Sequence, residues 1–103
     1  MVYAVFITEN FQKEMVGFSQ SDREKIQKVF LQLKENPFVG DAIRYRFFRE
    51  KRIKEKRIYY LIYDDLSAVL IVAISGKKTQ QKTIDYIIRY LPEYRRYVKN
   101  LFR

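Results

Sequence analysis

The sequence predicts an α+β fold in the order β-α-α-β-β-β-α. In this fold an antiparallel sheet carries an N-terminal helical hairpin on one face and a C-terminal helix at the other. Residues 43–74 contain three short strand-like segments separated by turns, which indicates an antiparallel meander. Apolar residues recur at helical spacing before and after this meander, in residues 11–33 and 84–101. The length of 103 residues predicts one domain, residues 1–103.

The N-terminal third is predicted to form a strand and two helices. Residues 2–7 are apolar in both alternating sets, which is typical of a strand that is buried on two faces or pairs inside a sheet. Thr8 is placed to cap a first helix, and Ser21 and Glu24 have the spacing of a capping box for a second. The apolar stripes of these helices are Phe11, Met15 and Phe18, then Ile26, Val29, Phe30 and Leu33, ending near Asn36 and Pro37. These stripes are predicted to cover one face of the sheet.

The central meander is predicted from alternating side chains. Apolar residues alternate with arginines from residue 43 onward until the Phe47-Phe48 pair, which predicts a β-bulge or a change of phase. Residues 52–56 are predicted to form a turn, and residues 57–63 the next strand. In that strand Ile58, Tyr60 and Ile62 share one face, whereas Arg57, Tyr59, Leu61 and Tyr63 share the other. After a turn at Asp64 and Asp65, residues 67–74 are predicted to form the most buried strand.

The C-terminal segment is predicted to form a bent or double helix. Ile84, Ile87, Ile88 and Leu91 define one apolar face, and Tyr94, Tyr97, Val98 and Leu101 define the next. Pro92 lies between the two sets, where it ends one helix and suits the first turn of another.

The composition excludes several kinds of chemistry. The chain has no cysteine and no histidine, which removes disulfides, thiolate catalysis and the commonest metal ligands and general bases. Any catalysis therefore depends on Lys, Arg, Tyr, Glu or Asp, and we expect no metal and no cofactor. The longest apolar run, residues 68–74, is much shorter than the roughly 20 residues of a membrane span. We therefore expect a cytoplasmic protein.

The net charge of +9 is concentrated in one segment. Residues 44–57 contain eight lysines and arginines against only Glu50 and Glu55. Together with tyrosines on the predicted strands, this charge predicts a concave cationic surface for single-stranded RNA, because basic groups neutralise phosphates and aromatic rings stack on unpaired bases. The candidate RNA-binding residues are Arg44, Arg46, Arg49, Arg52, Lys54, Lys56 and Tyr59. The alternative is a solvated basic surface without a nucleic-acid partner.

The chain resembles the RelE/ParE superfamily of toxins from type II toxin–antitoxin modules. The resemblance lies in the element order and in an Arg57-x-x-Tyr60-x-x-x-Asp64-Asp65 strand. A hydrophobic strand follows it and ends in Gly76-Lys77-Lys78. The resemblance covers roughly residues 2–86, and residues 92–103 look like a helical extension.

This resemblance implies a ribosome-dependent endoribonuclease that cleaves mRNA. It implies that Arg57 stabilises the scissile phosphate and that Lys77 or Lys78 acts as charge stabiliser or acid. Lys51 would stand for a basic residue of the family, with a possible role as base. The tyrosine of the family falls at Ile84 here, and Tyr86 is the nearest tyrosine.

The resemblance also implies a partner and leaves two alternatives open. The partner would be a small, acidic antitoxin, and the target would be mRNA in the ribosome. Some superfamily members instead poison DNA gyrase without cleaving RNA. A basic RNA-binding module without toxicity is the other alternative.

Overall fold

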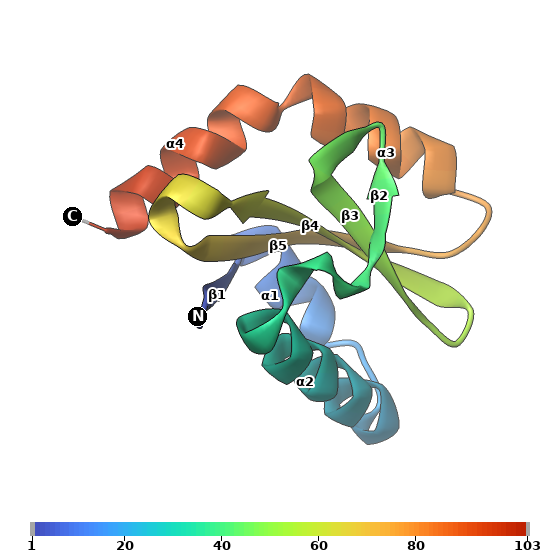
Figure 1. The fold of residues 1–103 in the computed structure, drawn as a ribbon. Coiled ribbons are helices and arrows are strands. Elements are labelled where there is room, and N and C mark those ends of the chain that lie inside the picture. The colour runs from blue at the N-terminus through green and yellow to red at the C-terminus, as the bar shows by residue number, and fades with distance from the viewer. Residues whose placement is uncertain (1, 103) are drawn as a thin grey trace.

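A five-stranded sheet of order β1-β5-β4-β3-β2 organises the chain (Figure 1). The computed structural model describes residues 2–102. The strands are β1 (Ala4–Ile7), β2 (Asp41–Ile43), β3 (Tyr45–Ile53), β4 (Lys56–Tyr63) and β5 (Ala68–Ser75). The helices are α1 (Glu9–Met15), α2 (Gln20–Glu35), α3 (Gln80–Arg89) and α4 (Leu91–Leu101), and short 3-10 turns span Pro37–Val39 and Asp64–Leu66. The predicted α+β class is confirmed, and so is the predicted element order, except that the short strand β2 was not predicted.

Helices cover both faces of the sheet, and β4 contributes side chains to both cores. Ile58, Tyr60 and Ile62 pack with Phe11, Ile26, Val29 and Leu33 of the N-terminal helices. Tyr59, Leu61 and Tyr63 pack with Ile84, Ile87 and Val98 of the C-terminal helices. Figure 1 shows α1 and α2 on one side of the sheet, with α3 and α4 arching over the other. The predicted alternation along β4 is therefore confirmed, and each face of β4 lies in a hydrophobic core.

The sheet is mixed, whereas the sequence predicted an antiparallel one. β2, β3, β4 and β5 are joined by antiparallel pairing, but β1 runs parallel to β5 with Ala4 opposite Ala68 and Ile7 opposite Ile71. In the sequence, α1 and α2 come between β1 and the other strands. A connection of this length permits parallel pairing. β1 is consequently an edge strand, and β5 has a neighbour on each side.

Local hydrogen bonds explain where the N-terminal helices begin. The Thr8 side chain accepts a hydrogen bond from the Phe11 amide, as predicted for the cap of α1. α2 is capped by Ser19, which accepts from the Asp22 amide at 3.1 Å. The cap therefore lies two residues before the predicted Ser21, because Ser19-Gln20-Ser21-Asp22 offers the same serine-to-amide spacing one half-turn earlier.

The β3–β4 hairpin is tighter than predicted. β3 continues to Ile53 and β4 begins at Lys56, so the loop holds only Lys54 and Glu55 rather than residues 52–56. Lys54 adopts a positive φ of 52°, as tight hairpin turns require. The predicted irregularity at Phe47-Phe48 is confirmed, because Ala42 pairs with Arg49 whereas Ile43 pairs with Tyr45, which leaves residues 46–48 of β3 without a partner on β2. A second register shift lies between Tyr59 and Tyr60.

Gly40 allows the segment before β2 to approach β3 and β4 closely. The buried Tyr60 hydroxyl donates to the Pro37 carbonyl at 2.7 Å and accepts from the Gly40 amide at 3.0 Å. A Cβ atom on Gly40 would lie only 2.4 Å from the Glu50 carbonyl oxygen and 2.6 Å from the Tyr60 hydroxyl. This position therefore has no room for a side chain.

α3 and α4 meet at Tyr90, where the sequence predicted a break. Pro92 lies in the first turn of α4, as predicted. α4 packs into the core through Val98, which is fully buried, and Arg95 donates two hydrogen bonds to Asp65 in the turn after β4. Within residues 2–102, every helix is too short or too polar to cross a lipid bilayer.

Candidate functional site

Basic side chains surround a cavity of about 470 Å³ at one end of the sheet. It lies where the β3–β4 hairpin meets the connection from β5 to α3. Its lining includes five lysines and arginines and one carboxylate: Arg52, Lys56, Arg57, Lys77, Lys78 and Glu55. We call this the cationic cavity. Five positive charges against one negative charge make it a site for an anionic ligand.

Strand register explains why these residues converge. Arg52 on β3 lies opposite Arg57 on β4, and Arg57 lies opposite Ser75 on β5. Directly opposed residues point to the same face of a sheet. Lys77 and Lys78 follow the end of β5 after one residue, Gly76, so the chain places them beside this row. The cavity thus joins residues separated by about 20 positions in the sequence.

Arg57 is the least exposed of the five cations that line the cavity. Its side chain is only 14% exposed, and its Nε lies 3.8 Å from Glu50 Oε2. The same Glu50 oxygen accepts a hydrogen bond from Gln80 Nε2 at 3.4 Å. Because 3.8 Å exceeds hydrogen-bond distance, Glu50 orients Arg57 without consuming its N–H donors. Arg57 is therefore positioned to bind a phosphate with its planar guanidinium.

The two lysines that follow β5 are open to solvent. Lys77 and Lys78 are exposed, and within residues 2–102 neither has an ion-pair partner. Glu55 is the only carboxylate among the lining residues that the structure describes. The cavity therefore offers proton donors, phosphate-binding cations and one proton acceptor.

Two of the predicted catalytic residues lie apart from the cationic cavity. Lys51 is opposite Ile58, one position out of step with the Arg52–Arg57 pair, so it points to the α2 face. Tyr86 lies in the second half of α3, is 53% exposed, and packs against Tyr90 at 4.6 Å between ring centroids. The structure brings together Arg57, Lys77 and Lys78, with Arg52 in the place predicted for Lys51.

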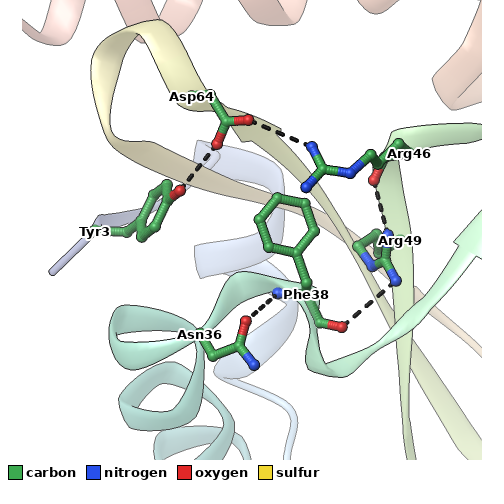
Figure 2. Close-up of polar contacts among 6 residues, drawn as sticks. All are labelled: Tyr3, Asn36, Phe38, Arg46, Arg49 and Asp64. Carbon is green, nitrogen blue, oxygen red and sulfur yellow. Dashed lines mark hydrogen bonds and ion pairs between the residues drawn. The ribbon is translucent and has the colours of Figure 1, made fainter. Parts of the chain in front are cut away.

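Arg46 and Arg49, both predicted to bind RNA, have internal partners (Figure 2). Arg49 donates to the carbonyls of Gly40, Arg46 and Phe38, at 3.0, 2.9 and 3.4 Å. Arg46 lies 4.2 Å above the Phe38 ring and 3.6 Å from Asp64. Figure 2 shows this network joining Asp64, which also accepts a hydrogen bond from Tyr3, to the segment before β2. Arg49 therefore holds the segment before β2 against β3.

The remaining predicted RNA-binding residues are dispersed. Arg44 occupies the turn between β2 and β3 with a φ of 61°, about 25 Å along β3 from Arg52 at the usual rise per residue. Lys54 lies 3.8 Å from Asp22 of α2. The Tyr59 ring has no exposed area, and its hydroxyl is hydrogen-bonded to Ser75 at 2.8 Å. A base cannot stack on Tyr59, and burial also raises the pKa of its hydroxyl.

Glu50 is a site residue that the sequence analysis did not identify. It was counted only as a charge opposing the basic segment. Its signal is its position two residues before Arg52 on the same strand face, which places it diagonally across from Arg57 in a hairpin. The position of Glu50 relative to Arg57 follows from the sequence only if the length of the hairpin loop is predicted correctly.

Comparison with solved structures identifies the fold. No protein-family model matches the sequence, and no curated protein sequence matches it. The free state of a mutant of the E. coli toxin RelE superposes with a TM-score of 0.73 at 16% identity, covering 86% of this chain and 98% of that chain. RelE in the intact E. coli RelBE toxin–antitoxin complex gives a TM-score of 0.65 at 17% identity, covering 72% and 95%. The archaeal RelE–RelB complex from Pyrococcus horikoshii gives 0.64 at 15% identity, covering 75% and 97%. The chain therefore has the fold of RelE toxins, as the sequence predicted.

Proposed function

We propose that this protein is the toxin of a type II toxin–antitoxin module and acts as a ribosome-dependent endoribonuclease that cleaves mRNA. The observation that carries the proposal is the convergence of Arg52, Arg57, Lys77 and Lys78 in one cavity of a RelE-like toxin fold. Such a cluster binds and stabilises a phosphate whose negative charge grows during reaction. A chain without histidine or cysteine can perform this chemistry with lysine, arginine and glutamate.

The proposed reaction is attack of a ribose 2′-oxygen on the adjacent phosphorus. The 2′-O–P bond forms, the bond from phosphorus to the 5′-oxygen breaks, and a 2′,3′-cyclic phosphate remains. Arg57, oriented by Glu50, would bind the non-bridging oxygens, and Arg52 would add a second positive charge. Charged hydrogen bonds of this kind strengthen as the phosphate becomes more negative.

Two proton transfers complete the reaction. Glu55 is the proposed acceptor of the 2′-hydroxyl proton, because it is the carboxylate that lines the cavity. Lys77 or Lys78 is the proposed donor to the departing 5′-oxygen, so that the number of protons balances. Glu55 takes the role for which the sequence had suggested Lys51.

The proposed partner is a small acidic antitoxin. A chain of net charge +9 with an open cationic cavity favours association with an anionic protein. Two of the structures with this fold are toxin–antitoxin complexes. Covering the cavity would block mRNA from reaching Arg57.

The test is cleavage of mRNA on purified ribosomes, mapped by primer extension. Wild type would be compared with Arg57→Ala, Glu55→Gln and, as a matched control, Arg96→Ala. Arg96 is an exposed arginine on α4 whose partner is Glu93, so its loss removes the same charge outside the cavity. We expect cuts in the ribosomal A site that fall at least a hundredfold for Arg57→Ala, about the effect of removing one oxyanion donor, and persist for Arg96→Ala.

Other outcomes would contradict the proposal in distinct ways. If no cleavage occurs and DNA supercoiling by gyrase is inhibited, the protein is a non-catalytic gyrase toxin. If the protein binds RNA but affects neither cleavage nor gyrase, it is an RNA-binding module without toxicity. Equal cleavage by wild type and Arg57→Ala would place the active site elsewhere.

A further inference from the structure

A second cavity, of about 420 Å³, lies at the opposite end of β4 from the cationic cavity. It is lined by β3, the end of β4 with the turn after it, and the first turns of α4, through Phe47, Ile62, Tyr63, Asp64, Asp65, Leu91, Pro92 and Arg95. We call it the Tyr63 pocket. β3 pairs with β4 only from Phe48 onward, so the preceding part of β3 leaves the last residues of β4 open to this pocket. Most of the wall is apolar.

Tyr63, which lines the pocket, has a buried hydroxyl without a partner among the residues that the structure describes. Tyr63 is only 7% exposed, and its hydroxyl makes no hydrogen bond within residues 2–102. Tyr59 and Tyr60 on the same strand both have partners, at 2.8 and 2.7 Å. Leaving a buried donor unpaired is unfavourable, so native proteins rarely do it without a reason. The occupant that fits this pocket carries a hydrogen-bond acceptor.

Phe47 forms one wall of the pocket and belongs to an exposed pair of stacked aromatic rings. Phe47 stacks on Tyr45 with ring centroids 5.1 Å apart and an interplanar angle of 10°. The two rings are 39% and 37% exposed, respectively. Parallel exposed rings on a strand form a platform on which a further planar ring can stack.

The charges near the pocket are balanced. Arg95 donates two hydrogen bonds to Asp65, and Arg46 pairs with Asp64 at 3.6 Å. An anionic group gains little from such neutralised arginines, so the pocket differs from the cationic cavity. A neutral planar ligand with acceptors on its edge suits it better. An apolar side chain from a protein partner would fill the volume but leave the Tyr63 hydroxyl unpaired.

We propose that the Tyr63 pocket binds an unpaired nucleobase of single-stranded RNA. The base would extend the Tyr45–Phe47 stack and accept a hydrogen bond from the Tyr63 hydroxyl. This inference rests on the proposed function for its RNA substrate. β4 separates Arg57 from Tyr63 by about 20 Å, which corresponds to about six stacked nucleotides. The pocket would therefore select a base several nucleotides from the scissile phosphate.

The test is a fluorescence titration with a single-stranded ten-nucleotide RNA that carries 2-aminopurine at successive positions. The RNA has a 2′-O-methyl group at every nucleotide and therefore cannot be cleaved. The variants are Tyr63→Phe, which removes the hydroxyl, and Phe47→Ala, which removes the stacking wall. The matched control is Tyr97→Phe, whose hydroxyl on α4 contacts the Ile7 carbonyl instead.

We expect quenching of 2-aminopurine at one position and a five- to tenfold weaker Kd for Tyr63→Phe, the usual effect of one hydrogen bond. Tyr97→Phe should bind like wild type. The loss in Tyr63→Phe should be independent of salt, because the hydroxyl is neutral, whereas Arg57→Ala should reduce the salt dependence. Phe47→Ala should abolish the quenching.

Equal affinity and equal quenching in wild type and Tyr63→Phe would overturn the proposal. Toluene serves as a probe for an apolar side chain. If toluene binds and 2-aminopurine is not quenched at any position of the RNA, the proposal is also overturned, and the pocket is assigned to an apolar side chain of a protein partner. Because the RNA cannot be cleaved, these results are separate from the cleavage assay. Quenching without ribosomal cleavage would retain the pocket and refute the endoribonuclease.

Discussion

Removing the hydroxyl of Tyr63 should make the protein more stable. Tyr63→Phe keeps the ring in its core, with Arg95 5.5 Å above it, and deletes only the unpaired oxygen. A buried polar group without a partner costs about 1–3 kcal/mol. We expect the free energy of unfolding to rise by about 1 kcal/mol, which corresponds to a Tm increase of roughly 4–8 °C for a domain of this size.

Tyr60→Phe is the matched comparison, because Tyr60 lies on the same strand with both of its hydrogen bonds made. Its hydroxyl bridges the Pro37 carbonyl and the Gly40 amide, and its removal leaves two buried backbone groups unpaired. We expect a loss of about 2 kcal/mol. The two substitutions delete the same atom from the same residue type, so their opposite signs isolate the hydrogen bonds.

The assay is urea unfolding followed by circular dichroism, with thermal unfolding as a second measurement. A shift in the midpoint at constant m-value reports stability alone. If Tyr63→Phe lowers the free energy of unfolding by more than about 0.5 kcal/mol, the Tyr63 hydroxyl has a partner in the folded protein. That result would refute the reasoning and weaken the inference of a base-binding pocket.

Three further predictions concern backbone packing, an ion pair and a helix cap. Gly40→Ala should lower the free energy of unfolding by about 1–3 kcal/mol in urea melts, because the new Cβ clashes with the Glu50 carbonyl; a wild-type midpoint would contradict the close approach. Arg95 holds the pKa of Asp65 below its ordinary value of 3.8, so the stability from this pair is present above that value. It is lost as the pH falls through the lowered pKa, and Asp65→Asn should lack this component of acid destabilisation in urea melts between about pH 5 and 2. Ser19→Ala should cost about 1 kcal/mol by removing the cap of α2, and Ser21→Ala, which removes no cap, is its control in the same thermal melts.

Three features set by local sequence were predicted correctly. The alternation along β4, the Thr8 cap and the helix break near Pro92 each depend on residues within one or two turns of one another. Such patterns follow directly from the periods of helices and strands. The parallel pairing of β1 with β5 depends on residues more than 60 positions apart, and no local pattern reports it.

The residues predicted to line the cationic cavity depended on the predicted length of the turn between β3 and β4. The sequence predicted a five-residue turn, whereas the hairpin loop contains only Lys54 and Glu55. A shift of one residue in strand register moves every side chain to the other face. The actual loop therefore places Arg52 rather than Lys51 beside Arg57. Tyr59 was predicted to bind RNA because the sequence of its own strand does not show how far the C-terminal helices, which were predicted at this face, cover it.

The parallel pairing of β1 with β5 also has a consequence for synthesis and folding. Ala4 is made near the beginning of translation but pairs with Ala68, so β1 has no strand to join until β5 has been made. Long-range pairing of this kind raises contact order and slows folding. Lys77 and Lys78 follow soon after β5, so the sheet is completed and the cationic cavity assembled only in the last third of the chain. A nascent chain that stops before residue 68 holds Arg57 but can neither close its sheet nor enclose a phosphate.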